Sequence, residues 1–139
     1  MKTLPLSSTE ELVLVKQFSV PILMNKSQMM TINNYSRVHW ATKSKIKNEY
    51  KQLLSNWFLD GSKIPENSHI HWLPTYKDAR RRDSINLASV AKIIEDVLVE
   101  TGSLADDNQT THTLHPGTHD KSLLNHTLTV YIYERKPIF

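Results

Sequence analysis

The 139-residue sequence contains no cysteine, three glycines, six prolines and no long apolar run. Without cysteine the chain can form neither a disulfide nor a thiolate metal site or nucleophile, which fits a reducing compartment. The scattered glycines and prolines mark no interdomain linker. No stretch approaches the roughly 18 apolar residues of a membrane span, and the first residues lack the apolar core of a secretory signal. We therefore expect a single cytoplasmic domain over residues 1–139, with no membrane segment.

Several common catalytic motifs are also missing. The sequence has no glycine-rich phosphate loop, no G-x-S-x-G and no H-E-x-x-H, so it carries none of these familiar signatures of nucleotide, ester or zinc-dependent peptide chemistry. The histidines near the C-terminus match no zinc spacing: His112, His115, His119 and His126. We expect structural or solvent-exposed roles for these four side chains.

Positive charge is modest overall but concentrated. The net charge is +3, yet Lys43–Lys51 carries four lysines against one glutamate, and Lys77–Arg82 four cations against one aspartate. Acidic residues then gather between Glu95 and Asp107. Basic segments around an acidic pocket suit a polyanion held over a cation-binding site. For Lys43–Lys51 alone, a solvated, lysine-rich helix surface explains the pattern equally well.

The hydrophobic pattern predicts alternating strands and helices. The expected elements are a strand over Leu12–Leu23, a helix over Ala41–Leu59, a strand over His69–Tyr76, a helix from Leu87 that stops at Gly102, a short strand after the loop that begins at Ser103, and a strand over Leu124–Arg135. This β-α-β-α-β-β order predicts the α+β class, with two main helices packed on a small mixed sheet of about four strands.

The three tryptophans are predicted to be core residues rather than platforms for base stacking. Trp57 and Trp72 fall within or next to apolar segments. Trp40 fits the core prediction least clearly, because it adjoins the basic helix.

Three arginines stand directly before an acid at the start of a predicted helix: Arg80, Arg81 and Arg82, followed by Asp83. Asp106 and Asp107 follow the end of the same helix. Carboxylates that converge near arginines suit Mg²⁺-dependent phosphodiester hydrolysis, because hard oxygen ligands hold the ion that activates water. The alternative is structural: Asp83 caps the helix and pairs with its arginines, and Asp106–Asp107 forms a solvated turn.

Lys92 is the candidate for stabilising negative charge that develops during such a reaction, because it lies off the apolar stripe of its helix. Asp83 at one end of the helix and Asp106–Asp107 beyond the other end can share an ion only if the chain satisfies a geometric condition. A helix of about fifteen residues separates its ends by roughly 20 Å. The acids can therefore meet only if the chain beyond Gly102 folds back along the helix.

Two segments resemble a known family. "RRRDSINLASVAKIIEDVLVETGSLADDNQ" resembles the signature of RusA-type Holliday junction resolvases: arginines, D-x-D-N, a helix with a lysine and an aspartate four residues later, a glycine and a D-D pair. "TINNYSRVHWATKSKIKNEY" is similar to the N-terminal part of phage-encoded members, and together the segments lie within roughly residues 18–110. The resemblance implies a small α+β homodimer of DNA recombination and repair. It would bind branched DNA and make paired nicks in four-way junctions with Mg²⁺, or with Mn²⁺ in its place.

Carried over by position, the resemblance implies specific roles. Asp83 matches the first acid of D-x-D-N and Asn86 its asparagine, while Lys92 and Asp96 match the helix lysine and its aspartate. Asp107 matches the catalytic acid of the D-D pair. The implied catalytic residues are Asp83, Lys92 and Asp107; the implied metal ligands are Asp83 and Asp107, with Asp106 and Asn86 as further candidates; the expected DNA-binding residues are Arg80, Arg81, Arg82, Lys43, Lys45 and Lys47.

Two departures from the family pattern bear on activity. The segment between Asn86 and Lys92 is longer than in the best-known member, so the match of Lys92 implies an insertion. Ile85 stands where the family has its second catalytic aspartate, and an aliphatic side chain cannot bind a hard cation.

Three explanations of Ile85 remain open. Asn86, Asp96 or Asp106 replaces the missing ligand; the protein binds branched DNA without cutting it; or the isoleucine is an introduced inactivating substitution. A different class of function is open as well, namely a protein-interaction domain whose basic surface is incidental.

Overall fold

The computed structural model describes residues 3–5, 10–22, 40–59, 61–78, 87–105 and 110–137. These residues form β1 (Thr3–Pro5), β2 (Glu10–Pro21), α2 (Trp40–Ser55), β3 (His69–Tyr76), α3 (Ala88–Glu100), β4 (Thr111–Leu114), β5 (Thr118–His119) and β6 (Thr127–Pro137). The predicted α+β class and the order of the main elements are confirmed. The two shortest strands, β1 and β5, extend the predicted set.

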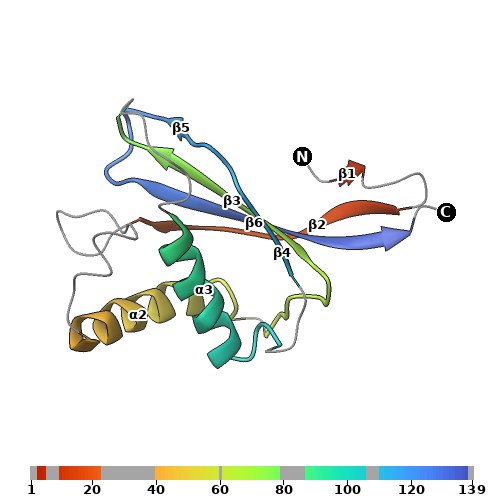
Figure 1. The fold of residues 1–139 in the computed structure, drawn as a ribbon, viewed down its shortest axis with the longest axis horizontal. Coiled ribbons are helices and arrows are strands. Elements are labelled where there is room, and N and C mark those ends of the chain that lie inside the picture. Colours follow the sequence, from red (N-terminus) through yellow and green to blue (C-terminus); the bar gives the residue numbers. More distant parts are fainter. Residues whose placement is uncertain are drawn as a thin grey trace.

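The strands form one mixed sheet in the order β1-β2-β6-β3-β4, with β5 also paired to β3 (Figure 1). The β2–β6 and β6–β3 pairs are antiparallel, whereas β4 and β5 run parallel to β3. Strand β3 is therefore paired on both sides. Because a parallel partner needs a crossover connection, the chain from β3 to β4 passes through α3.

The alternation of side chains along the strands defines two unlike faces of the sheet. On β3, Ile70, Trp72 and Tyr76 are buried, whereas His69 and His71 on the opposite face are half-buried. Both helices lie on one side of the sheet and cover the apolar face (Figure 1). The largest fully buried side chains are Trp72, Phe18, Ile22, Ile70, Leu87, Ile94, Leu98, Leu128, Ile132, Val20 and Val90.

Helix α3 presents an apolar stripe to the sheet and ends where the sequence predicts. Gly102 has a φ of 80°, a left-handed conformation that glycine adopts without steric cost. The backbone N–H groups of Ser103 and Leu104 donate to the carbonyl of Leu98 at 2.9 and 3.1 Å. At the other end, Leu87 occupies the N-cap position without a side-chain cap. Asp83 is therefore not the N-cap residue of α3.

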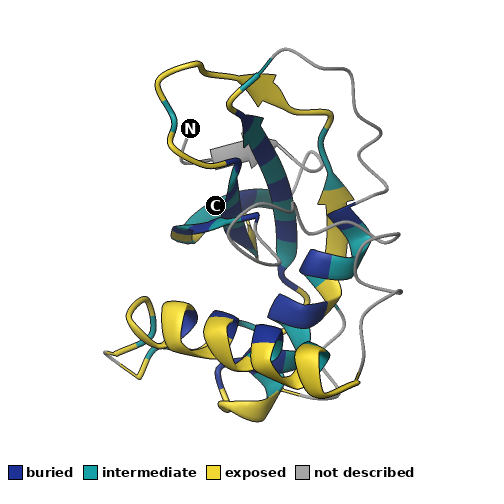
Figure 2. Cartoon of the chain, turned by 90° about the vertical axis from the view of Figure 1, so that its left-hand side faces the viewer, coloured by how far each residue is buried: buried dark blue, intermediate teal, exposed yellow. Residues whose placement is uncertain are grey.

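The tryptophans divide between core and surface. Trp72 is fully buried, as predicted, but Trp40 is 72% exposed and Trp57 is 43% exposed, so the core prediction is wrong for these two. Trp40 is the first residue of α2, whose buried side is formed by other residues (Figure 2). Trp57 lies beyond the end of α2 and covers Phe18, with 6.3 Å between the ring centroids. Neither described helix has the length and apolar character to span a membrane.

Candidate functional site

A cavity of about 300 Å³ lies between the two helices. Its lining consists of Lys47 from α2, Lys92, Glu95, Asp96, Val99 and Glu100 from α3, and Leu104 and Ala105 from the segment that follows α3. Three carboxylates and two ammonium groups thus line one cavity. Such a lining suits a charged ligand rather than an apolar molecule.

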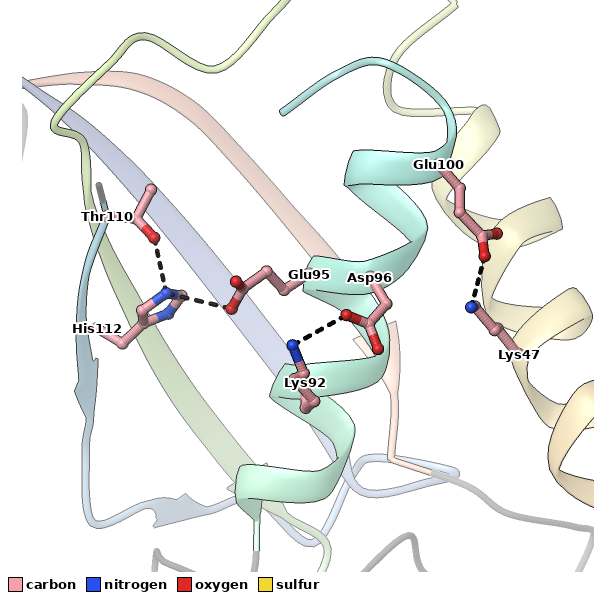
Figure 3. A network of polar contacts seen from close by, with 7 residues as sticks. All are labelled: Lys47, Lys92, Glu95, Asp96, Glu100, Thr110 and His112. Carbon is pink, nitrogen blue, oxygen red and sulfur yellow. Dashed lines mark hydrogen bonds and ion pairs between the residues drawn. The ribbon is translucent and has the colours of Figure 1, made fainter. Parts of the chain in front are cut away.

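Lys92 and Asp96 form an ion pair on the outer side of α3, with 3.1 Å between Nζ and Oδ1 (Figure 3). One helical turn separates the two residues, so their side chains share a face. The Lys92 side chain is 68% exposed. Exposed pairs with this spacing contribute about 0.3–0.5 kcal/mol, so Lys92 loses little when it leaves Asp96 for another anion.

Lys47 and Glu100 connect α2 to α3, with 2.6 Å between Nζ and Oε1 (Figure 3). Both side chains keep partial access to solvent. The carboxylate of Glu100 offsets the charge of Lys47 at this edge of the cavity. The contact also fixes where the basic side of α2 stands relative to Lys92.

Glu95 is held at the opposite edge of the cavity by a histidine that the sheet positions. Nε2 of His112 lies 3.3 Å from Oε2 of Glu95, and the buried Nε1–H of Trp72 donates to Nδ1 of His112 at 3.0 Å. Because Nδ1 accepts, the proton of a neutral His112 ring sits on Nε2, from which it can donate to Thr110 at 2.8 Å or to Glu95 (Figure 3). His112 thus has a structural contact, as expected from its sequence context.

The segment after α3 turns back along the helix. The carbonyl of Ser103 accepts a hydrogen bond from the N–H of Ile64 at 2.7 Å, and Leu104 is buried in the core. Ala105 then lines the same cavity as Lys92. Ala105 is the last described residue of this segment, so the convergence of the acids beyond it stays a prediction.

The predicted site residues divide into two groups. One group lies outside the described residues: Arg80, Arg81, Arg82, Asp83, Ile85, Asn86, Asp106 and Asp107. Lys92 and Lys47 line the cavity together. Lys43 is half-buried and Lys45 is exposed on α2. At 3.6 residues per turn, Lys45 points away from the side that carries Lys43 and Lys47.

Within the described ranges, no group of three or more histidine, aspartate or glutamate side chains is arranged to hold a metal ion. The main acids of the predicted Mg²⁺ site are outside those ranges. In the sequence, Glu95 and Glu100 belong to the acidic cluster that follows the arginines, but neither was assigned a role in the site. Their spacing from Lys92 along one side of α3 is the signal that could have identified them.

A histidine pair on the face of the sheet opposite α2 and α3 also escaped the sequence interpretation. Nδ1 of His71 lies 2.8 Å from Nε2 of His115, and the two rings stack with 5.0 Å between centroids. Burial lowers the pKa of His71, and the nearby charges of His115 and His69 lower it further. His126 is separate from this pair and accepts a hydrogen bond from the N–H of Lys77 at 3.1 Å.

The described geometry thus comprises a charged cavity between two helices, with Lys47 and Lys92 in its lining. In comparisons with known proteins, the chain matches no family model and no curated protein.

Proposed function

We propose that the protein is a Mg²⁺-dependent, structure-selective endonuclease that acts as a homodimer and resolves four-way DNA junctions by paired nicks. One observation carries the proposal: Ala105, directly before Asp106 and Asp107, lines the same cavity as Lys92. If α3 continued straight, its ends would hold the two groups of acids roughly 20 Å apart. The turn at Gly102, which places Ala105 in the lining of that cavity, supports the proposal.

The proposed metal ligands lie beside the cavity in sequence, because the described carboxylates do not themselves form a metal-binding group. The described carboxylates of Glu95, Asp96 and Glu100 supply oxygen atoms, the ligand type that Mg²⁺ prefers. In the proposal, Asp83 and Asp107 hold Mg²⁺, or Mn²⁺ in its place, with Asp106 and Asn86 as further ligands. The bound ion would activate water and offset negative charge on the phosphate.

Lys92 has the role of stabilising charge on the scissile phosphate or on the leaving oxygen. Its ammonium group is exposed and forms an ion pair with Asp96. Exchange of Asp96 for a phosphate oxygen therefore needs little energy. Asp96, once released, remains beside the cavity as a carboxylate that can accept a hydrogen bond.

The proposed substrate is branched DNA in the cytoplasm, in a phage or prophage recombination and repair pathway. Lys43, Lys45, Lys47 and the three arginines before Asp83 are the proposed DNA-binding residues. Their contacts with phosphates would make binding fall steeply as salt concentration rises. A protein-interaction domain with an incidental basic surface would show no such salt dependence.

The test is cleavage of a labelled synthetic four-way junction in Mg²⁺ or Mn²⁺, with EDTA and a linear duplex as controls. Symmetric, metal-dependent nicks in the junction are expected. Asp83→Asn and Asp107→Asn should abolish cleavage while junction binding survives. Asp120→Asn, an equivalent change in the exposed turn after β5, is the matched control. If both site variants still cut, these aspartates do not form the site.

A second function is favoured by Ile85. A carboxylate missing from the metal site would leave a protein that binds branched DNA without cutting it. In that case the wild-type protein should retard the junction but leave it uncut, and Ile85→Asp should create metal-dependent cleavage. If the wild-type protein cuts and Ile85→Asp adds nothing, another residue already supplies the ligand.

A further inference from the structure

The indole of Trp40 is 72% exposed at the first residue of α2. A single exposed apolar residue is common on protein surfaces and needs no explanation by itself. Trp40 differs from such a single residue because lysines lie next to it on the surface of α2. The second aromatic residue of α2, Tyr50, is buried and donates its hydroxyl to the carbonyl of Pro21 at 2.9 Å.

Lysines continue from Trp40 along one side of α2. With 3.6 residues per turn, residues three, seven and eleven positions further on lie within about 60° of the direction of Trp40. These residues are Lys43, Lys47 and Lys51. We call Trp40, Lys43, Lys47 and Lys51 the Trp40 stripe; it is about 16 Å long at 1.5 Å per residue.

The acidic residue of α2 stays off this stripe. Glu49 lies on the opposite side of the helix, together with Lys45 one turn earlier. The stripe is therefore purely cationic along α2, with one aromatic side chain at its end. Trp40 and Lys51 are exposed, whereas Lys43 and Lys47 are half-buried, because this side of α2 adjoins the buried side that carries Ile46, Tyr50 and Leu54. Exposed residues alternate with buried ones along the helix (Figure 2). The stripe also borders the charged cavity, because Lys47 belongs to both.

We propose that Trp40 stacks on an unpaired or unstacked base of branched DNA, while Lys43, Lys47 and Lys51 contact phosphates of the same strand. An aromatic platform beside a line of cations is the arrangement that binds single-stranded nucleic acid. Bases inside a duplex already stack on both sides and offer no free ring face. Bases at a branch point can offer one, so Trp40 selects for branched or single-stranded DNA.

This inference rests on the proposed function for its substrate but assigns a separate task. The cavity around Lys92 would act on a phosphate, whereas Trp40 would recognise a base. Glu100 offsets the charge of Lys47 at the cavity edge, whereas Lys51 lies one turn further along α2 and is exposed. Base recognition and phosphate chemistry are therefore separable by mutation.

The test is equilibrium binding to three labelled probes: a four-way junction, a short oligo(dT) and a fully paired duplex. Trp40→Ala should weaken binding to the junction and to oligo(dT) by about 5- to 150-fold, the effect of losing one stacked base. Duplex binding should not change. Trp40→Phe should keep most of the affinity, because its ring can still stack.

Two controls separate stacking from other effects. Leu59→Ala removes an apolar side chain that is 79% exposed outside the stripe and should leave all three affinities unchanged. Lys51→Ala should reduce the slope of log K against log salt by about one, whereas Trp40→Ala should leave that slope unaltered. Equal losses on all three probes in Trp40→Ala, or no loss on any, would overturn the inference.

Cleavage and binding together distinguish a failure of the proposed nuclease function from a failure of the stacking role. Junction cleavage by the wild-type protein together with unchanged binding in Trp40→Ala supports the nuclease and overturns the stacking role. Binding that depends on Trp40 without any cleavage supports the stacking role and overturns the nuclease. If the wild-type protein binds no DNA probe and the stripe instead attaches to a protein, both are overturned.

Discussion

The Nδ1 atom of His71 lies 2.8 Å from the Nε2 atom of His115, between β3 and the residue that follows β4. One hydrogen bond of this kind holds one proton, so one ring donates and the other accepts. Burial is the largest cause of the lowered pKa of His71, and the charges of His115 and His69 act in the same direction. The folded protein therefore favours the neutral form of His71 over its protonated form.

Stability should consequently depend on pH in a defined direction. Between the ordinary histidine pKa of 6.5 and the lowered pKa of folded His71, the unfolded chain binds more protons than the folded one. The free energy of unfolding should therefore fall as pH drops below about 6.5 and level off below the folded pKa. Urea unfolding at about pH 7.5 and about pH 5 measures this difference.

His71→Gln should make that pH dependence shallower. It should not remove it, because burial and the Arg135 charge also lower the pKa of His69. His119→Gln, a change at an exposed histidine in β5, is the control and should keep the wild-type slope. A His71→Gln slope equal to that of wild type would show that the pair does not control stability in this range.

Gly117 should not tolerate even a methyl group. A Cβ atom there would lie 2.7 Å from Cε2 of Tyr76 and 2.9 Å from the carbonyl oxygen of Pro74. The clash involves backbone, so relief requires movement of the segment that joins β4 to β5. Gly117→Ala should lower the free energy of unfolding by about 1–3 kcal/mol. Lys121→Ala in the next exposed turn should change it by less than about 0.5 kcal/mol, and equal effects would contradict the close approach.

Hydrophobic periodicity predicted those elements that pack against the core through one face only. Strand β3 has the predicted bounds, because its alternate residues face the helices. Helix α2 ends at Ser55 instead of the predicted Leu59. The apolar pattern continues past Ser55 because Phe58 packs on Phe18, with 5.8 Å between centroids, from a turn rather than from the helix. Sequence spacing does not distinguish these two ways to reach the core.

The site was predictable only where its residues share one element. Lys92 and Asp96 follow from helical spacing alone. The Glu95–His112 pair joins α3 to β4, and the His71–His115 pair joins β3 to the residue after β4. Both depend on the parallel register that sets Trp72 opposite Leu114. No local pattern encodes that register. The arginines and the acids that flank α3 lie outside the described residues, so their roles stay predictions.

Trp72 should contribute both packing and a polar contact. Its side chain is fully buried, and its Nε1–H donates to Nδ1 of His112. Trp72→Phe removes the smaller ring and the donor, so it should destabilise the protein by about 2 kcal/mol. The control is Trp57→Phe at a partly exposed position, with an expected loss below about 1 kcal/mol. Similar losses would mean that the bond to His112 adds nothing to stability.

Substitution of Lys92 should affect the cleavage rate strongly and the free energy of unfolding only slightly. Lys92→Ala removes a pair worth only about 0.3–0.5 kcal/mol, so the denaturation midpoint should barely move. Junction cleavage should fall by about 10²–10³-fold, the usual cost of losing one group that stabilises transition-state charge.

The loss in Lys92→Ala should appear in the single-turnover cleavage rate rather than in junction affinity, because the proposed role concerns the reacting phosphate. Lys121→Ala controls for the removal of one exposed lysine. Asp96→Asn breaks the same ion pair but keeps the ammonium group, so it should retain more activity than Lys92→Ala if the ion pair itself is unimportant. Equal rates in Lys92→Ala and wild type would exclude Lys92 from the reaction and leave it as a surface residue paired with Asp96.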